Sequence, residues 1–248
     1  SILFTNLQKL IKIMMKNAVI TGATQGIGKA IAEKLLSEGL NLAFCARNET
    51  DVASCIQQWQ AQFPHQKVAG FIVDLSKKEA VIQFAKDALQ TLGNIEVLIN
   101  NAGIYMPGSI ANEEDGNLEQ LLQVNLLSAY HLTRSLLPHL HSHSKAHIFN
   151  MCSVASLKAY PHGGSYSISK YALLGFSDNL REELKESAIR VTAIEPGATY
   201  SRSWEGAAID TNRIMEANDI AIMLWAAMQV SKQANVEHIV IRPIKGDL

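Results

Sequence analysis

The sequence lacks the features that define several large classes of protein. Its 248 residues include only three cysteines with no C-x-x-C pair, and this odd number does not indicate a disulfide framework in a chain of this length. We therefore predict a reducing, cytoplasmic location. No apolar run is long enough to cross a bilayer, so the sequence predicts no membrane span.

Charge is also scarce, and it is nearly balanced. The chain has 22 Lys and Arg against 23 Asp and Glu, which gives a formal net charge of -1. It therefore creates no long-range positive potential that could hold a polyanion, which argues against nucleic acid or an acidic membrane surface as the main partner. Charged residues make up 18% of the chain, below the usual ~25%, and this leaves room for surface buried in an oligomer.

The N-terminal stretch is poor in charge as well, with Lys9 and Lys12 as its only ionised side chains before residue 16. It is rich in apolar residues but lacks a small-residue cleavage site. We expect residues 1–14 to be a leader outside the fold, translated upstream of a native start at Met14 or Met15. The alternative is a helix that lies on a membrane surface, which the small number of charges disfavours.

The chain does contain enough apolar sequence for a large core. Hydrophobic residues make up 48% of it, and folding at this size buries roughly 70% of the surface of the unfolded chain. Short β-branched or apolar runs alternate with longer amphipathic runs, which indicates βαβ units around a parallel sheet. No linker rich in Pro, Gly or Ser divides the chain, so we predict one α/β domain over residues 15–248. The predicted strands are 17–21, 40–46, 68–74, 97–101, 146–152, 190–195 and 237–242.

A glycine-rich turn joins the first predicted strand to the first predicted helix. Its sequence, TGATQGIG, places glycines where a tight turn, an approach of backbone N–H groups to a diphosphate, and close helix–strand packing are needed. The N-terminus of the helix adds partial positive charge at the same place. This context favours a dinucleotide site over the alternative, a plain βα connection. The expected contact residues are Thr21, Gly22, Thr24, Gln25, Gly26, Ile27 and Gly28.

A tyrosine and a lysine lie four residues apart in the predicted helix after the fifth strand. This spacing places the phenol of Tyr166 and the ammonium of Lys170 on one helix face, about one turn apart. At ~5 Å and an effective dielectric of ~20, the ammonium would favour the phenolate by roughly 3 kcal/mol, or about two pK units. We therefore expect Lys170 to lower the pKa of Tyr166 toward neutrality, as a general acid/base requires. Without other motifs, such a pair is usually a surface pair.

The Gly-x-x-x-Gly-x-Gly spacing and four further motifs resemble the short-chain dehydrogenase/reductase family over residues 16–248. The resemblance implies a Rossmann-type, doubly wound fold with helices on both faces of the sheet. It implies that Ser153, in Asn-Met-Cys-Ser after the fifth strand, polarises the substrate oxygen beside Tyr166. It also implies that Asn125 orders a water that links Lys170 to solvent. Hydride would then pass between a nicotinamide cofactor and a carbonyl carbon while Tyr166 moves the proton.

The end of the second predicted strand bears on the choice of cofactor. Ala46 stands where NAD-preferring members of the family carry Asp, and Arg47 offers a charge-assisted partner for a 2′-phosphate. We therefore predict NADP, with NADPH preferred over NADH; the alternative is that Arg47 is a solvated loop charge. Gln25 stands where NADP-preferring members often carry a second basic residue, which favours a moderate preference.

Other segments at strand ends resemble cofactor sites of the family. The resemblance implies that Asp74 contacts the adenine; the alternative is that it caps the next helix, which we predict to open with a capping box at residues 76–79. Asn-Asn-Ala-Gly after the fourth strand would let a ribose lie against the backbone. The further implied contacts are Leu75, Asn101, Ala102, Gly103, Tyr166, Lys170, Pro196, Gly197 and Thr199.

The segment after the sixth strand is a predicted substrate lid, over about residues 199–217. Trp204 would close over a small substrate or, alternatively, pack on its own helix. Tyr160 and His162, just before the catalytic helix, are candidates for pocket lining or ordinary loop residues. The H-x-H-x-H run at residues 139–143 lacks a flanking Cys or acid at ligand spacing, so we predict a solvated loop and no metal site. The predicted substrate contacts are Ser153, Tyr166 and Trp204.

Together these residues predict an NADP-dependent oxidoreductase that interconverts a carbonyl and a secondary alcohol in a small molecule. The C-terminal sequence EHIVIRP resembles members that reduce small ketones, 3-oxo or 3-hydroxy acids, and bacterial sepiapterin reductases. The alternatives are a 3-oxoacyl carrier-protein reductase and, from another class, a catalytically silent dinucleotide sensor. The resemblance also implies a homotetramer or homodimer built from the helices that carry Asn125 and Tyr166.

Overall fold

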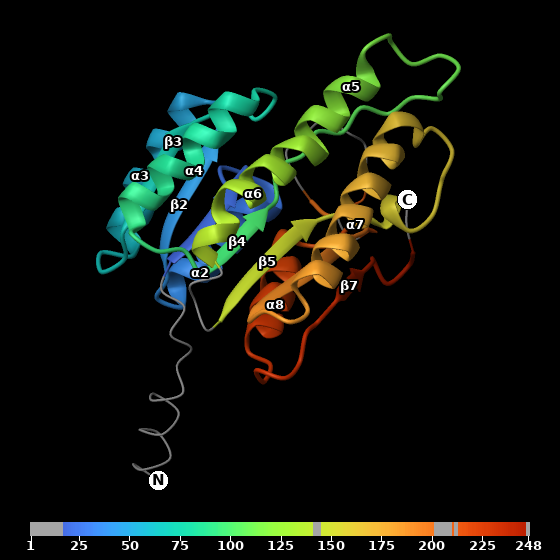
Figure 1. The fold of residues 1–248 in the computed structure, drawn as a ribbon. Helices are drawn as coiled ribbons and strands as arrows, with labels where there is room; N and C mark the ends of the chain where they lie inside the picture. The colour runs from blue at the N-terminus through green and yellow to red at the C-terminus, as the bar shows by residue number, and fades with distance from the viewer. Residues whose placement is uncertain (1–16, 141–144, 201–209, 211–212, 247–248) are drawn as a thin grey trace.

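A parallel sheet with helices on both sides organises the chain (Figure 1). The computed structural model describes residues 17–140, 145–200, 210 and 213–246. Seven strands pair in the order β3-β2-β1-β4-β5-β6-β7, and every pairing is parallel. The predicted seven-stranded parallel sheet is confirmed. The strands are β1 Asn17–Thr21, β2 Asn41–Ala46, β3 Val68–Ile72, β4 Val97–Asn100, β5 Ala146–Met151, β6 Ile189–Pro196 and β7 His238–Ile241.

The order of the strands reverses between β1 and β4. From β1 the chain first builds outward through β2 to β3, and then returns to build β4 to β7 on the other side. In open α/β sheets, ligands bind at the carboxyl ends of the strands beside such a switch point. The glycine turn after β1 and the Asn-Asn-Ala-Gly segment after β4 both begin there. The topology alone therefore brings two of the predicted cofactor segments together.

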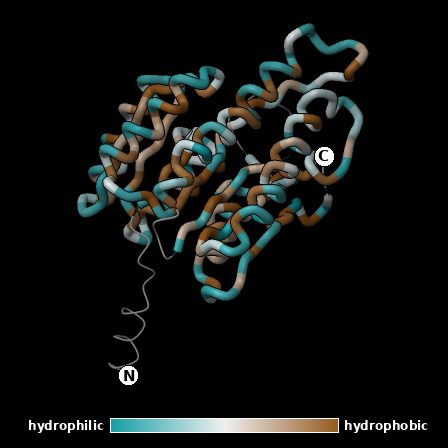
Figure 2. Tube along the Cα trace, in the orientation of Figure 1, coloured by the Kyte–Doolittle hydropathy of each residue, from teal (hydrophilic) through white to brown (hydrophobic). Residues whose placement is uncertain are grey.

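Two layers of helices cover the sheet, as predicted (Figure 1). Because both faces are covered, the strands are rich in apolar residues, whereas the outer helices mix hydrophobic and hydrophilic residues along their length (Figure 2). In β1, for example, Ala18 and Ile20 belong to one core and Val19 to the other. One layer contains α2 Gly26–Ser37, α3 Glu49–Gln62 and α8 Ala217–Met228; the other contains α4 Lys78–Leu92, α6 Ser128–Leu140 and α7 Gly164–Leu184.

One long helical stretch changes its winding around Asn125. Helix α5 (Asn117–Leu122) continues through a π-helical segment, η1 (Gln123–Leu127), into α6. Single wide turns of this kind are frequent at functional sites. Here the wide turn directs a polar amide into the interior, since Asn125 is only 1% exposed.

The start of α4 differs from the prediction. Its N-cap is Lys77, whose side chain makes no cap hydrogen bond, and the helix begins at Lys78. Ser76 instead donates its hydroxyl to Oδ1 of Asp74 at 2.7 Å, and the same oxygen accepts the Ser76 N–H at 3.0 Å. The predicted capping box at residues 76–79 is therefore wrong, because a nearby carboxylate takes the serine hydroxyl that would have capped the helix.

Several predicted features fall outside the described residues. They include the leader, Trp204 and most of the lid, of which only residues 199, 200, 210 and 213–217 are described. His139 lies in the last turn of α6 rather than in the predicted loop, and residues 141–144 are not described. Within the described ranges, no three His, Cys, Asp or Glu side chains are grouped so as to hold a metal ion. None of the described helices is both long and apolar enough to cross a membrane.

All three cysteines are buried and unpaired with one another. Burial raises the pKa of the Cys45 and Cys152 thiols to about 12, and it also raises the pKa of Cys55. The three thiols are therefore protonated at neutral pH, and a thiol in that state is a weak nucleophile.

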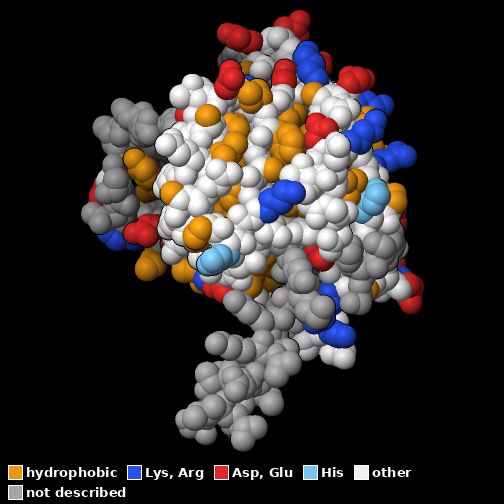
Figure 3. Space-filling view, turned by 90° about the vertical axis from the view of Figure 1, so that its left-hand side faces the viewer, with side chains coloured by type: hydrophobic (Ala, Val, Ile, Leu, Met, Phe, Trp, Pro, Cys, Tyr) orange, Lys and Arg blue, Asp and Glu red, His pale blue; other side chains and the backbone are white. Residues whose placement is uncertain are grey.

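The surface mixes both signs of charge. Figure 3 shows acidic and basic side chains on one face, with hydrophobic side chains between them. On α2, Lys29 pairs with Glu33 at 3.8 Å and Lys34 with Glu38 at 2.7 Å, both with i, i+4 spacing. Pairs of this kind contribute only about 0.3–0.5 kcal/mol each, so the two apolar cores stabilise the fold far more than surface charge does.

Candidate active site

The turn between β1 and α2 is held by the segment that follows β4. Nδ2 of Asn101 donates to the carbonyl oxygens of Thr21 and Gly22, each at 2.9 Å. In return, Oγ1 of Thr21 accepts the N–H of Asn101 at 3.1 Å and that of Ala102 at 3.0 Å. Four hydrogen bonds thus join two predicted cofactor segments into one unit, and they engage the Asn101 amide within the protein.

Glycine is required at three positions of this turn. Gly22 and Gly26 have φ of 68° and 52°, in the left-handed region that other residues rarely adopt. A Cβ on Gly28 would lie 2.1 Å from the carbonyl oxygen of Gly22 and 2.4 Å from Nδ2 of Asn101. Within α2, all of which is described, the N-cap Gln25 makes no side-chain cap and the first turn has no acidic residue. The first N–H groups of α2 are therefore suited to an anion.

Arg47 and Asp74 lie close together, beyond the carboxyl ends of β2 and β3. The two hydrogen bonds from Ser76 hold the pKa of Asp74 below its ordinary value, and the nearby charge of Arg47 contributes. Because β3 ends at Ile72, Asp74 lies in a loop rather than in the predicted strand. The side chain of Leu75 is buried in the core beneath α4, so only its backbone faces the loop side.

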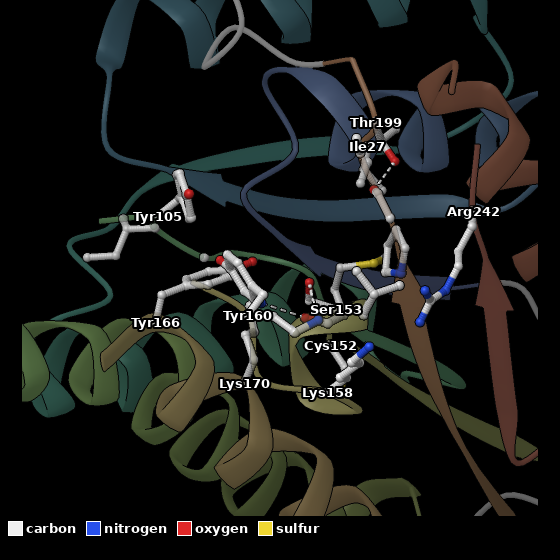
Figure 4. Close-up of a pocket in the computed structure, with 18 of the residues that line it drawn as sticks. Ile27, Tyr105, Cys152, Ser153, Lys158, Tyr160, Tyr166, Lys170, Thr199 and Arg242 are labelled. Carbon is white, nitrogen blue, oxygen red and sulfur yellow. Dashed lines mark hydrogen bonds between the residues drawn. The ribbon is translucent and has the colours of Figure 1, made fainter. Parts of the chain in front are cut away.

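The predicted catalytic hydroxyls and ammonium come from the end of β5 and from α7 (Figure 4). Oγ of Ser153 accepts the N–H of Ala155 at 3.1 Å, and Ser153 lies close enough to Tyr166 to lower the pKa of its phenol. Nζ of Lys170 donates to the carbonyl oxygen of Met151 at 2.8 Å and lies 5.9 Å from the centroid of the Tyr166 ring. The structure therefore brings together three of the four predicted catalytic residues.

Desolvation controls the ionisation of this group. The Tyr166 ring lines a cavity, yet burial raises its pKa above the ordinary value, and the neighbouring Ser153 side chain lowers it by less. Burial also lowers the pKa of Lys170 to about 8. The expectation that Lys170 brings the pKa of Tyr166 toward neutrality is therefore wrong for the protein alone, because loss of water disfavours the phenolate more than the neighbours favour it.

Asn125 lies behind this group rather than on the cavity wall. Its Oδ1 accepts the N–H of Ile104 at 2.8 Å, and its Nδ2 donates to the carbonyl of Ile104 at 3.1 Å and to Oγ of Ser169 at 2.9 Å. A Cβ on Gly103 would lie 3.3 Å from both Oδ1 of Asn125 and Nζ of Lys170. The amide and the ammonium are thus neighbours across the Gly103 backbone.

A cavity of about 580 Å³ opens beside these residues. Thr199, at its rim, is buried and donates its hydroxyl to the carbonyl of Gly197 at 2.9 Å. The predicted site residues that line the cavity are Ile27, Asn101, Gly103, Ser153, Tyr166, Lys170, Pro196, Gly197 and Thr199. The other described ones lie at the glycine turn, at the ends of β2 and β3, or behind the wall: Thr21, Gly22, Thr24, Gln25, Gly26, Gly28, Arg47, Asp74, Leu75, Ala102 and Asn125.

Tyr105, Lys158 and Arg242 are among the residues of the cavity wall that sequence reasoning missed. The ring of Tyr105 meets that of Tyr166 edge-on, with centroids 4.8 Å apart, and Tyr105 also lies near Tyr160. Tyr160 lines the cavity, which was one of the two alternatives predicted for it. Its pKa is raised, mainly by burial. A signal was present for Arg242, which directly follows the last residue of β7, since the carboxyl ends of strands face the site.

Known proteins resemble this chain along most of its length. Residues 16–211 match the family model described as short chain dehydrogenase, and the chain belongs to this family. An "uncharacterized oxidoreductase" from Staphylococcus epidermidis is 29% identical over 233 residues, which cover 94% of this chain and 99% of that protein. The predicted family and enzyme class, an oxidoreductase, are thereby confirmed.

Solved structures agree with the fold. An alcohol dehydrogenase from the archaeon Thermococcus sibiricus, complexed with 5-hydroxy-NADP, has a TM-score of 0.85 at 26% identity, covering 93% of this chain and 97% of that chain. A metagenomic short-chain oxidoreductase in complex with NADP has a TM-score of 0.80 at 29% identity, covering 94% of this chain and 98% of that chain. The predicted Rossmann-type, doubly wound fold is confirmed.

Proposed function

We propose that this protein is an NADP-dependent oxidoreductase that interconverts a carbonyl and a secondary alcohol by hydride transfer. One observation carries the proposal: the side chains of Ser153 and Tyr166 and the buried ammonium of Lys170 line one cavity beside the glycine turn (Figure 4). Two hydroxyls that converge on one point can both donate to a single substrate oxygen. The two similar structures that contain NADP or its derivative support the choice of cofactor.

The nucleotide end of the site fits a dinucleotide with a 2′-phosphate. The N-terminus of α2 offers N–H groups to a diphosphate, and glycine at position 28 lets the helix approach closely. Arg47 supplies a cation beyond β2, where the phosphate would lie. When bound, the cofactor would supply the redox chemistry: the reduced form, NADPH, gives a hydride to the carbonyl carbon, and the oxidised form, NADP, takes one from the alcohol. The residues that would hold it are Thr21, Gly22, Thr24, Gln25, Gly26, Ile27, Arg47, Asp74, the backbone of Leu75, Asn101, Ala102, Gly103, Pro196, Gly197 and Thr199.

Tyr166 moves the proton in this mechanism. Because its pKa is raised, the phenol is protonated at neutral pH and is ready to donate to the oxygen of a carbonyl that is being reduced. The hydroxyl of Ser153 donates to the same oxygen and fixes its position. The ammonium of Lys170, held by the carbonyl of Met151, stabilises the phenolate that remains. With a pKa of about 8, Lys170 can also return a proton, and Asn125 orders the water that connects it to solvent.

The substrate in this proposal is a small ketone or a 3-oxo or 3-hydroxy acid. The cavity wall carries the cations Lys158 and Arg242 as well as Lys170, and no Asp or Glu is among its described residues. In the view of Figure 4, Lys158 and Arg242 lie across the cavity from Tyr105. A carboxylate on the substrate would therefore meet positive charge there, while its carbonyl oxygen meets the two hydroxyls.

The proposal extends to assembly as a homodimer or homotetramer through the helices that carry Asn125 and Tyr166. On α7, Ile168 is 42% exposed and Tyr171 is 44% exposed, so an apolar strip of this helix faces outward. Size-exclusion chromatography with light scattering tests this. A clean monomer at micromolar concentration would contradict it.

The decisive experiment measures oxidation of NADPH and of NADH, in parallel, with 3-oxobutanoate, its neutral methyl ester, simple ketones and aldehydes. We expect turnover with NADPH, slower turnover with NADH, and a higher kcat/KM for the acid than for the ester. Binding of NADPH without turnover of any carbonyl would favour the dinucleotide sensor instead. A longer acyl thioester as the best substrate would favour a carrier-protein reductase.

A further inference from the structure

A carboxylate outside the proposed catalytic group holds the first turn of α7. Glu113 lies in the connection between β4 and α5, residues 101–116. Its Oε2 accepts the N–H of Ser165 at 3.3 Å, and its Oε1 accepts the hydroxyl of the same serine. Ser165 is buried and Glu113 is half-buried, whereas the next acids, Glu114 and Asp115, are exposed. Glu113 therefore makes a directed contact that its neighbours do not make.

This contact supplies what the local sequence of α7 lacks. The N-cap residue is Gly163, which has no side chain, and the first turn of this fully described helix contains no acid. The first N–H groups of a helix need acceptors, and its positive end favours a carboxylate. Glu113 provides both the acceptor and the negative charge from a distant segment of the chain. Ser165 directly precedes Tyr166, so the carboxylate acts on the turn from which the phenol projects.

The two backbones cross closely at this contact. The N–H of Gly108 donates to the carbonyl of His162 at 3.1 Å, and a Cβ on Gly164 would lie 2.3 Å from the carbonyl oxygen of Gly108. His162 has φ of 61°, the only positive φ of a non-glycine residue in the described ranges. Such a conformation is unfavourable and persists only where surrounding contacts impose it.

The same connection is also fixed at its beginning, where the side chain of Asn125 makes two hydrogen bonds to the backbone of Ile104. Between the two fixed points lies Tyr105, whose ring packs against that of Tyr166 with centroids 4.8 Å apart. An acceptor that holds the far end of the connection therefore also restricts the position of Tyr105.

We propose that Glu113 is a positioning residue, which fastens the β4–α5 connection to α7 and thereby fixes Tyr105 against Tyr166 as one wall of the cavity. Glu113 itself contacts neither the substrate nor the cofactor. The catalytic consequence rests on the proposed function, whereas the fastening concerns the chain alone. The two can therefore be tested separately.

The test compares Glu113→Ala and Glu113→Gln with the matched control Glu114→Ala. We expect the backbone amides of residues 104–113 to exchange hydrogen roughly tenfold faster in Glu113→Ala than in the wild-type protein, and at the wild-type rate in the control. The kcat for carbonyl reduction should fall roughly tenfold in Glu113→Ala, with the dissociation constant of NADPH within about twofold of wild type. Glu113→Gln keeps one acceptor and should recover part of the loss.

Unchanged exchange over residues 104–113 in Glu113→Ala would overturn the proposal, as would faster exchange in an active enzyme with no loss of kcat. An equal loss in the Glu114 variant would also overturn it, because a general effect of charge would then be responsible. If Glu113→Ala does not fold, Ser165→Ala, which removes only the hydroxyl donor, is measured in the same way. If the wild-type protein turns over no carbonyl, the proposed function is wrong, and the exchange measurement alone decides whether Glu113 holds the connection.

Discussion

The half of the molecule that we assign to the nucleotide and the half that carries the reacting groups bury very different side chains. Among the described residues, the segment 17–100 buries four polar or charged side chains, whereas the segment 125–199 buries fifteen. In the first half, binding groups are backbone atoms and exposed loop residues placed on an apolar core. In the second half, polar side chains are part of the core itself.

The second half uses many of these side chains in hydrogen bonds to one another and to Asn100, the last residue of β4. Nδ2 of Asn100 donates to Oδ1 of Asn150 at 2.8 Å, and Nδ2 of Asn150 donates to Oγ of Ser177 at 2.8 Å. Within the described structure, Oγ of Ser167 and Oε2 of Glu195 are buried with no hydrogen-bond partner, which is unfavourable. The difference teaches that exposed loop side chains of the nucleotide half, such as Arg47, can be altered without loss of stability, whereas stability and chemistry are linked in the other half.

The largest expected effect is on the reacting phenol. Tyr166→Phe removes the proton donor but keeps the ring against Tyr105, so kcat should fall about 10²–10⁴-fold while the affinity for NADPH is unchanged. Steady-state kinetics and a fluorescence titration with NADPH measure the two quantities. The control is Tyr171→Phe, at an exposed position on the same helix. If Tyr166→Phe lost NADPH binding together with turnover, the nucleotide half and the catalytic half would not be functionally separate.

A second prediction concerns the stability of the catalytic half. Burial lowers the pKa of Lys170 from its ordinary value of 10.5 to about 8 in the folded protein, so between these values the unfolded chain binds more protons. Stability should therefore rise with pH through this window, and the penalty, on the order of 3 kcal/mol, is present in full below pH 8. Lys170→Met should abolish this rise in the free energy of unfolding, which urea denaturation measures across the same pH range. Lys185→Met, at an exposed lysine, should retain it; the same slope in Lys170→Met would contradict the linkage.

The third prediction sharpens the comparison within the nucleotide half. Gly28→Ala would push a Cβ into the carbonyl of Gly22, so we expect a loss of about 2 kcal/mol in the free energy of unfolding and NADPH binding at least about tenfold weaker. Gly175→Ala, whose Cβ would have no atom within 4 Å among the described residues, should gain up to about 1 kcal/mol in its helix. Wild-type NADPH affinity in Gly28→Ala would show that the turn does not depend on this close packing.

The smallest effect is expected at an exposed loop. Arg47→Gln should weaken NADPH binding about tenfold, because it removes a charge-assisted hydrogen bond that contributes roughly 1.4 kcal/mol. NADH binding and the stability of the fold should be unchanged. Isothermal titration with both cofactors measures this, and Lys77→Gln, the other cation near Asp74, serves as the control. An equal loss for NADH would contradict recognition of a 2′-phosphate.

Much of the fold was predictable because both faces of a parallel sheet are buried. Strands then read as apolar runs, and every predicted strand overlaps an observed one. The ends were less accurate, as at Asp74, because a carboxylate and a hydroxyl can form several local hydrogen bonds that the pattern does not distinguish. The glycine turn was predictable since positive φ at Gly22 and close approach at Gly28 both demand glycine.

The rest of the site depends on contacts between distant segments. Tyr105 and Glu113 belong to an irregular connection, and no local pattern shows that it folds back onto α7. The pKa of Tyr166 was predicted with the wrong sign because the calculation paired two charges and omitted the loss of water around the phenol. Residue spacing predicts which groups are neighbours on one helix, but it does not predict how far the fold shields them from solvent.

The three buried, protonated thiols make the chain a convenient host for a single spectroscopic label. Because Cys45, Cys55 and Cys152 are shielded and their pKa values are raised, maleimide reagents will modify them slowly under native conditions. A cysteine introduced in place of Ile110, which is 72% exposed, would then react selectively without prior removal of the native ones. A fluorophore attached there would report directly on movements of the segment that Glu113 is proposed to restrain.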